Sequence, residues 1–324
     1  MLFAKWIALV LTLLLEQVRA TPSSNPFYAG TTAWADKVAQ GLNAGKPRHG
    51  AYGWFIVVGA GVLLCAGIFA LAWSWHWILG LAFNVFVLFF TLGFRQFSHP
   101  ITVIQTALEQ GDAEEARRLF VEWRRRADPD FDPTEISEAE IARQSIEFGL
   151  LAAHRHVFGV LFWFLVLPGP SGAVLYRLSE YLSRHWNRPA PHSEAGLPVD
   201  QFGRFAQQAY AWIDWLPARM TSLGFAIVGD FEGALFCWRH LTIDSRPNVT
   251  GGRMLILAAA GGAMGVRVFS AVEAAKYFDA SAQEGAALAE PGPEALRSAV
   301  GLAWRAMILW MVLLLLLSLA KALQ

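Results

Sequence analysis

The sequence predicts an all-α fold, a polytopic helical integral membrane protein with a helical cytoplasmic segment. Of its 324 residues, 55% are hydrophobic and 16% are charged, against roughly 25% charged residues in an average soluble domain. A helix needs about 20 residues to cross a bilayer, and several apolar runs come close to that length. The formal net charge is zero, so nothing favours a nucleic-acid partner. Two cysteines cannot build a disulfide framework.

Residues 1–94 are predicted to hold an N-terminal membrane helix, an interfacial segment and a helical hairpin. The run from Met1 to Leu15 is typical of a short membrane helix or of a signal peptide cleaved near Ala20. Charged residues just before that point favour the retained helix. Residues 21–53 are polar and mixed, with a short amphipathic stretch that we expect at the membrane interface.

The hairpin is predicted from two apolar runs and the turn between them. Trp54 to Ala72 is long enough to span, and Ile78 to Phe94 runs back. The turn Trp73–Trp77 is rich in tryptophan, which is typical of the aromatic belt at a membrane face.

Residues 95–147 form the clearest water-facing segment. Two capping boxes, Asp112–Glu115 and Ser137–Glu140, predict helix starts. The segment carries many arginines: Arg95, Arg117, Arg118, Arg124, Arg125, Arg126 and Arg143. Basic residues also precede the hairpin, so the positive-inside rule places both flanks of the hairpin in the cytoplasm. We interpret the arginine run as a solvated helix face in preference to a phosphate site.

Residues 148–324 are predicted to form a membrane domain with broken helices and a C-terminal membrane helix. A break is expected at Pro168–Gly172, a proline-rich linker at 187–203 and a loop at 276–298. Gly261 and Gly265 have the spacing of a close helix contact. Ala299–Leu319 is the clearest membrane helix.

The stretch Trp212–Phe225 is the first candidate site. Asp214 and Arg219 lie in apolar and aromatic sequence on either side of Pro217, which should break or kink a helix and free backbone groups that need partners. Ionisable groups at membrane depth usually pair or line a cavity. On the other interpretation, Asp214 caps a helix and Arg219 reaches the lipid headgroups.

A second candidate group lies where the helix that begins after Ser137 enters apolar sequence. Arg143, Glu147 and His154 share one face of that helix, which allows proton handling or anion binding. A salt bridge beside an interfacial histidine is the alternative. No spacing of His, Cys and carboxylates resembles a metal site, and no standard phosphate-binding loop is present.

Several motifs together carry a family resemblance over about residues 80–270. They are Trp-Leu-Pro-Ala-Arg-Met-Thr at Trp215–Thr221, Ile104–Glu109, Ile141–Glu147, Val160–Phe164 with Gly172–Tyr176, and Arg246–Asn248 with Gly261–Val268. The first resembles the N-Y/W-L-P-A-R-L signature of the CobD/CbiB membrane proteins of cobalamin biosynthesis, and the others resemble further segments of that family.

The resemblance implies an adenosylcobinamide-phosphate synthase, which joins an aminopropanol phosphate to a corrinoid carboxylate as an amide, with ATP and Mg²⁺ as expected cofactors. It implies catalytic roles for Glu147 and Asp214. It implies substrate-binding roles for Arg143, Arg219, Asn248 and His154. Lipid and, in a homo-oligomer, a second copy of the chain are further expected partners, and the resemblance implies a multi-pass protein of the bacterial inner membrane.

The chain departs from that family at several polar positions. Phe148 stands where the family has Asn, and residues 177–185 replace its N-T-L-D-S-M-V-G-Y motif. Ile213–Arg219 also resembles the AmpE-type membrane proteins of the same superfamily, which are associated with sensing in β-lactamase induction. A corrinoid amide synthase and a non-catalytic membrane modulator therefore both stand as hypotheses.

Overall fold

A computed structural model describes residues 2–18, 26–43, 47–126, 128, 131, 136–188, 201–244, 246–279 and 288–323. Over these residues the chain is built from helices, with only isolated β-bridges, which confirms the all-α prediction. The helices are α1 Leu2–Val18, α2 Pro26–Leu42, α3 Pro47–Trp54, α4 Ala60–Trp75, α5 Trp77–Thr91, α6 Phe94–Glu109, α7 Ala113–Arg125, α8 Glu138–Ala153, α9 Gly159–Val166, α10 Ser171–His185, α11 Phe202–Val228, α12 Phe231–Arg239, α13 Val249–Met264, α14 Ala271–Tyr277 and α16 Pro293–Ala322. The predicted cleavage site near Ala20 and most of the proline-rich linker lie outside the described residues.

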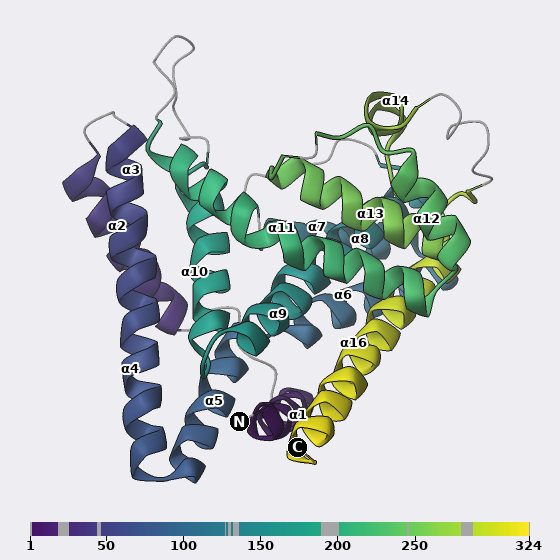
Figure 1. Cartoon of the computed structure of the whole chain (residues 1–324). Helices are drawn as coiled ribbons and strands as arrows, with labels where there is room; N and C mark the ends of the chain where they lie inside the picture. Colours follow the sequence, from purple (N-terminus) through teal and green to yellow (C-terminus); the bar gives the residue numbers. More distant parts are fainter. Residues whose placement is uncertain are drawn as a thin grey trace.

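Three continuous helical stretches are long and apolar enough to cross a membrane. Arg48–Trp75 includes α4, Glu138–Val166 joins α8 to α9, and Pro293–Ala322 is α16. The most apolar part of the middle stretch is 67% buried inside the protein, against 22% and 28% for the outer two. Figure 1 accordingly shows α4 and α16 on opposite flanks with α9 between them. The outer helices present apolar surface that suits lipid, so the chain is an α-helical membrane protein.

The predicted hairpin is confirmed, with its turn at His76. The side chain of His76 caps α5 by accepting a hydrogen bond from the Ile78 backbone N–H at 3.2 Å. Gly80 lets α5 approach α4, because a Cβ there would lie 2.5 Å from the Trp73 ring. Both helices keep large apolar side chains exposed, including Leu63.

The break predicted at 168–172 is also confirmed, because α9 ends at Val166 and α10 begins at Ser171. Gly169 has a φ of +58°, which an L side chain rarely adopts. The Lys5 ammonium of α1 donates to the carbonyls of Phe164 at 2.8 Å and Leu167 at 2.7 Å. It thereby satisfies acceptors that the end of α9 leaves unpaired.

Of the break or kink predicted at Pro217, the break is wrong, since α11 is one continuous helix from Phe202 to Val228. Proline has no N–H to give to the carbonyl four residues earlier, which belongs to Ile213. The Trp163 indole of α9 donates to that carbonyl at 3.0 Å. The predicted need for a partner is thus met by a neighbouring helix, and α11 continues.

Two predictions for the C-terminal part need correction, one on a loop and one on a helix contact. The predicted loop 276–298 contains the end of α14 and the start of α16 at Pro293. Gly265 ends α13 as a left-handed cap with φ +66° and makes no close helix contact. The close contact lies at Gly262, where a Cβ would fall 2.2 Å from the Gly233 carbonyl oxygen of α12.

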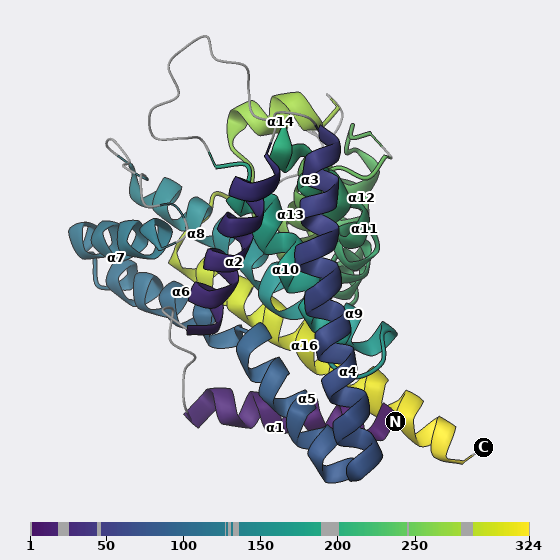
Figure 2. The same ribbon diagram turned by 90° about the vertical axis from the view of Figure 1, so that its left-hand side faces the viewer.

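Helices α6, α7 and the start of α8 make up the predicted cytoplasmic segment, which projects from one side of the bundle in Figure 2. Asp112 and Ser137 each accept the expected N-cap hydrogen bond, at 3.0 and 3.3 Å. Helix α7 buries Phe120 and Trp123 against its neighbours and exposes its charged face. The boundary predicted at residue 147 falls inside α8, which continues into the span.

Candidate functional site

A narrow cleft between α11 and the start of α13 gathers three of the predicted site residues, Asp214, Arg219 and Asn248. The two helices lie side by side in Figure 1. The segment before α13 adds Asp244 and Arg246. The cleft holds a volume of about 20 Å³, so the described conformation is closed around it.

The floor of the cleft is the first turn of α13. Asn248 caps this helix by accepting from the Gly251 N–H, and its amide donates to the Arg246 carbonyl at 2.9 Å. Gly251 and Gly252 line the cleft and place no side chain in it. Backbone N–H groups and the helix dipole at such a terminus favour an anion.

Asp214 is buried beneath this turn and is held by two side chains. Its Oδ1 atom lies 2.8 Å from His154 Nε2 and accepts a hydrogen bond from the Tyr176 hydroxyl at 2.7 Å. The Oδ2 atom faces Gly252, where a Cβ would lie 3.5 Å away. One carboxylate oxygen is therefore fixed by the protein and the other faces the cleft.

The sequence predicts that Asp214 and Arg219 pair with each other or line a cavity, and of these two expectations the pairing is wrong. The Arg219 guanidinium lies over the Trp215 ring, 3.8 Å from its centroid, and donates to the Trp215 carbonyl at 3.0 Å. Asp214 is not a helix cap either, because it lies in the middle of α11. Both side chains still border the same cleft, so the cleft combines a carboxylate with a guanidinium.

His154 does not reach the cleft as a substrate ligand would. It is 2% exposed, and its second ring nitrogen, Nδ1, lies 2.9 Å from the Thr221 hydroxyl oxygen. Tyr210 extends the network, with its hydroxyl 3.1 Å from that of Tyr176. Protein groups thus occupy both nitrogens of His154.

Arg143 and Glu147 form a separate network. Arg143 pairs with Glu140 at 2.7 Å and with Glu147 at 3.0 Å, and Arg253 of α13 bridges Glu147 and Glu273. Arg143, Glu147 and His154 therefore do not act as one group. Helix α8 packs against α13 near Arg143 and Glu147, whereas the His154 side chain contacts Asp214 of α11. The salt-bridge interpretation is confirmed for Arg143 and Glu147.

The Glu273 carboxylate anchors α14 to this network. It completes a capping box with Ser270 and accepts from Arg253 at 2.9 Å. Burial raises the pKa of Glu273, but the Ser270 N–H and the Arg253 guanidinium outweigh burial and hold the pKa below its usual value. Glu273 is thus held ionised as a partner of Arg253.

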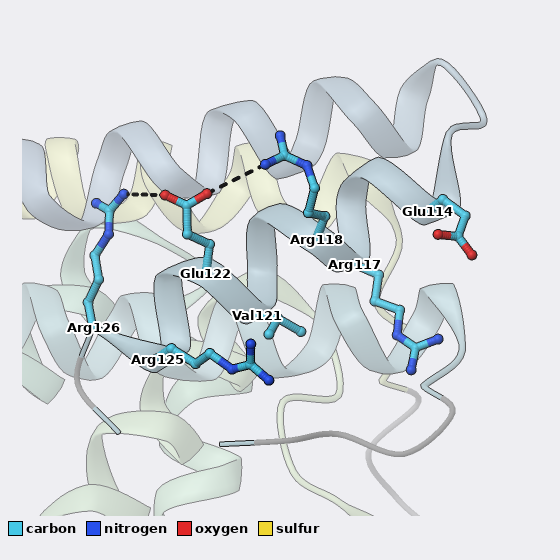
Figure 3. Close-up of a pocket in the computed structure, with 7 residues that line it drawn as sticks. All are labelled: Glu114, Arg117, Arg118, Val121, Glu122, Arg125 and Arg126. Carbon is cyan, nitrogen blue, oxygen red and sulfur yellow. Dashed lines mark hydrogen bonds and ion pairs between the residues drawn. The ribbon is translucent and has the colours of Figure 1, made fainter. Parts of the chain in front are cut away.

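The arginine-rich face of α7 forms a wide, open hollow of about 670 Å³ (Figure 3). Glu122 lies between Arg118 and Arg126 and pairs with them at 3.7 and 2.9 Å. The side chains of both arginines are more than half exposed. Ion pairs of this kind contribute little, which supports the interpretation as a solvated face.

The functional residues that sequence reasoning missed are Tyr176, Thr221 and Arg253. Packing between helices brings Tyr176 to Asp214, Thr221 to His154 and Arg253 to Glu147. Tyr176 and Thr221 do lie inside the motifs that carried the family resemblance, which was the available signal. Within the described part of the chain, no group of three or more His, Cys, Asp or Glu side chains is placed to hold a metal ion.

Comparisons with known proteins agree with the motifs. The CobD/Cbib protein family matches residues 6–303. The cobalamin biosynthesis protein CobD of Stutzerimonas stutzeri (strain A1501) is 27% identical over 315 residues, covering 96% of this chain and 97% of that protein. The protein of the same name from Chromobacterium violaceum is 34% identical over 190 residues, covering 58% of this chain and 56% of its own. No solved structure gives a significant match. Since the family match extends over nearly the whole chain, this protein belongs to the CobD/Cbib family.

Proposed function

We propose that this protein acts in cobalamin biosynthesis as an adenosylcobinamide-phosphate synthase, forming an amide between an aminopropanol phosphate and a corrinoid carboxylate. Family membership and the two relatives named as cobalamin biosynthesis proteins support this role. The observation that carries the proposal is the cleft, which places two carboxylates and two guanidinium groups around a helix N-terminus. An amino alcohol phosphate has one cationic end and one anionic end, and the cleft offers a group for each.

The phosphate end would bind the basic side of the cleft. Arg219 and Arg246 supply guanidinium groups, which match phosphate geometry. The first turn of α13, capped by Asn248, adds backbone donors. Arg143 is not assigned to phosphate binding, because its guanidinium forms ion pairs with Glu140 and Glu147.

The amine end would meet Asp214. For the amine to react, its ammonium form must first lose a proton. The Oδ2 atom of Asp214 faces the cleft and is placed to accept that proton as a general base. The amine nitrogen then bonds to the carboxyl carbon of the corrinoid, the carbon–oxygen bond to the group that activated the carboxylate breaks, and the nitrogen releases its second proton to solvent. The proposal requires the cleft to open when the substrate binds, because the volume of the cleft in the present structure is smaller than that of an amino alcohol phosphate.

The chemistry of the donor set fits the expected ATP and Mg²⁺, although the site has no standard phosphate loop. Magnesium is usually bound through one or two carboxylates together with phosphates, and Asp244 is the carboxylate of the cleft that remains for it when Asp214 meets the amine. When bound, ATP would supply the activation of the corrinoid carboxylate. Glu147 is not part of this set, because two arginines neutralise it.

The setting of the reaction is part of the same proposal. We infer that the protein crosses the bacterial inner membrane several times with residues 95–147 in the cytoplasm, where arginines are frequent. Lipid then covers the apolar flanks of α4 and α16.

Complementation tests the proposal. The gene should restore cobinamide formation in a strain that lacks its synthase, and Asp214→Asn should abolish the rescue. Arg126→Gln, on the exposed face of α7, is the matched control and should rescue fully. No rescue by a wild-type protein present at normal levels in the membrane would refute the synthase and favour the AmpE-like modulator. Deletion of the gene should then change β-lactamase induction while corrinoid content stays constant.

A further inference from the structure

Asp214 is held asymmetrically, by two side chains that come from different helical segments. Its Oδ1 atom meets the hydroxyl of Tyr176 from α10 and Nε2 of His154 from the turn between α8 and α9. Its Oδ2 atom faces the glycine-lined start of α13. This arrangement determines that Oδ2, and not Oδ1, is the carboxylate oxygen that faces the cleft.

Hydrogen-bond counting assigns the proton on His154. Tyr176 has one hydroxyl proton, which it gives to Asp214, and an ionised carboxylate can only accept. His154 must therefore donate from Nε2 to Asp214. In the neutral imidazole, Nδ1 then accepts from the Thr221 hydroxyl 2.9 Å away.

The backbone at His154 supports a functional reason for this geometry. His154–Phe158 is a π-helical turn within the continuous stretch Glu138–Val166. Such turns are rare and occur frequently at functional sites. The turn begins at the residue whose side chain contacts Asp214.

We propose that Thr221, His154 and Tyr176 are positioning residues for Asp214. Thr221 fixes the tautomer of His154, and His154 and Tyr176 together orient the carboxylate so that Oδ2 faces the substrate amine. The inference rests on the proposed function and assigns to His154 a role different from substrate binding. None of the three positioning residues touches the substrate.

The test compares Thr221→Val with Thr221→Ser in the full-length protein, purified and placed in lipid nanodiscs. Amide formation is measured with aminopropanol phosphate, a cobinamide acceptor, ATP and Mg²⁺. Valine keeps the volume and removes the hydroxyl, so kcat should fall by about 10- to 100-fold, part of the roughly 10²- to 10⁴-fold that a general base contributes. KM for the amine should change little, and serine should keep kcat within about twofold of wild type.

Tyr176→Phe is the second variant, because it keeps the ring and removes one donor to Asp214. It should also lower kcat with little change in KM. If Thr221→Val fails to accumulate, the kcat of Tyr176→Phe tests the positioning role in its place. Wild-type kcat in either variant, or an equal loss in serine and valine, overturns the positioning role while leaving the synthase intact. A folded wild-type protein that forms no amide overturns the synthase and the inference together.

Discussion

The donor that Trp163 supplies to α11 gives a prediction that is independent of function. Trp163→Phe removes the indole N–H and leaves the Ile213 carbonyl, 3.0 Å away in the present structure, without its donor. A polar group left unsatisfied away from water costs about 1–3 kcal/mol, and the Trp163–Ile213 hydrogen bond is part-buried. The smaller ring adds a packing loss of about 1 kcal/mol. We therefore expect the free energy of unfolding to fall by about 2–4 kcal/mol.

A double-mutant cycle separates these two contributions. In a Pro217→Ala background, residue 217 regains an N–H that can bond to the Ile213 carbonyl in the ordinary helical pattern. Trp163→Phe should then cost only its packing loss, so the coupling energy should be about 1–3 kcal/mol. The measurement is unfolding in mixed micelles titrated with SDS and followed by far-ultraviolet circular dichroism.

The control is Trp212→Phe, since Trp212 is 70% exposed and its removal should change stability by less than about 0.5 kcal/mol. The reasoning fails if Trp163→Phe costs the same in both backgrounds, with a coupling energy below about 0.5 kcal/mol. In that case the indole stabilises the protein by packing alone.

Two further predictions concern packing and topology. Gly262→Ala should destabilise the α12–α13 contact by about 1–3 kcal/mol, because the new Cβ would lie 2.2 Å from a backbone oxygen of α12. Gly301→Ala is the control and should be neutral, because nothing lies within 4 Å of its Cβ. Equal melting temperatures of the two variants in detergent would show that α12 and α13 can separate without cost. Cysteines placed at Asp112 and Glu138 should resist a membrane-impermeant thiol reagent in intact cells, because the positive-inside rule predicts that the arginine-rich segment faces the cytoplasm. Both natural cysteines are buried, and labelling of both new ones would reverse the predicted topology.

Much of the fold follows from local properties that the sequence states directly. Apolar runs long enough to span, the turn at His76 and the proline–glycine break at 168–172 predicted elements that the structure confirms. The N-caps at Asp112 and Ser137 were predicted in the same way. These features depend on residues within a few positions of one another, so composition and periodicity are enough to find them.

The candidate site was predictable in its members but not in its pairings. Sequence motifs indicated Asp214, Arg219 and Asn248, and the structure places all three at one cleft. Proximity along the chain suggested that Asp214 pairs with Arg219. Asp214 instead bonds to His154, which lies 60 positions away in the sequence.

Only the tertiary structure decided which polar groups satisfy one another. Pro217 lies within a continuous helix because Trp163 of another helix supplies the missing donor. Glu147 is neutralised by Arg253, which is 106 positions away. Local sequence fixes where a helix starts and which face is apolar, because those preferences arise within one or two turns. The partner of a buried charge depends on which helices pack together, and that choice is made by the whole chain at once.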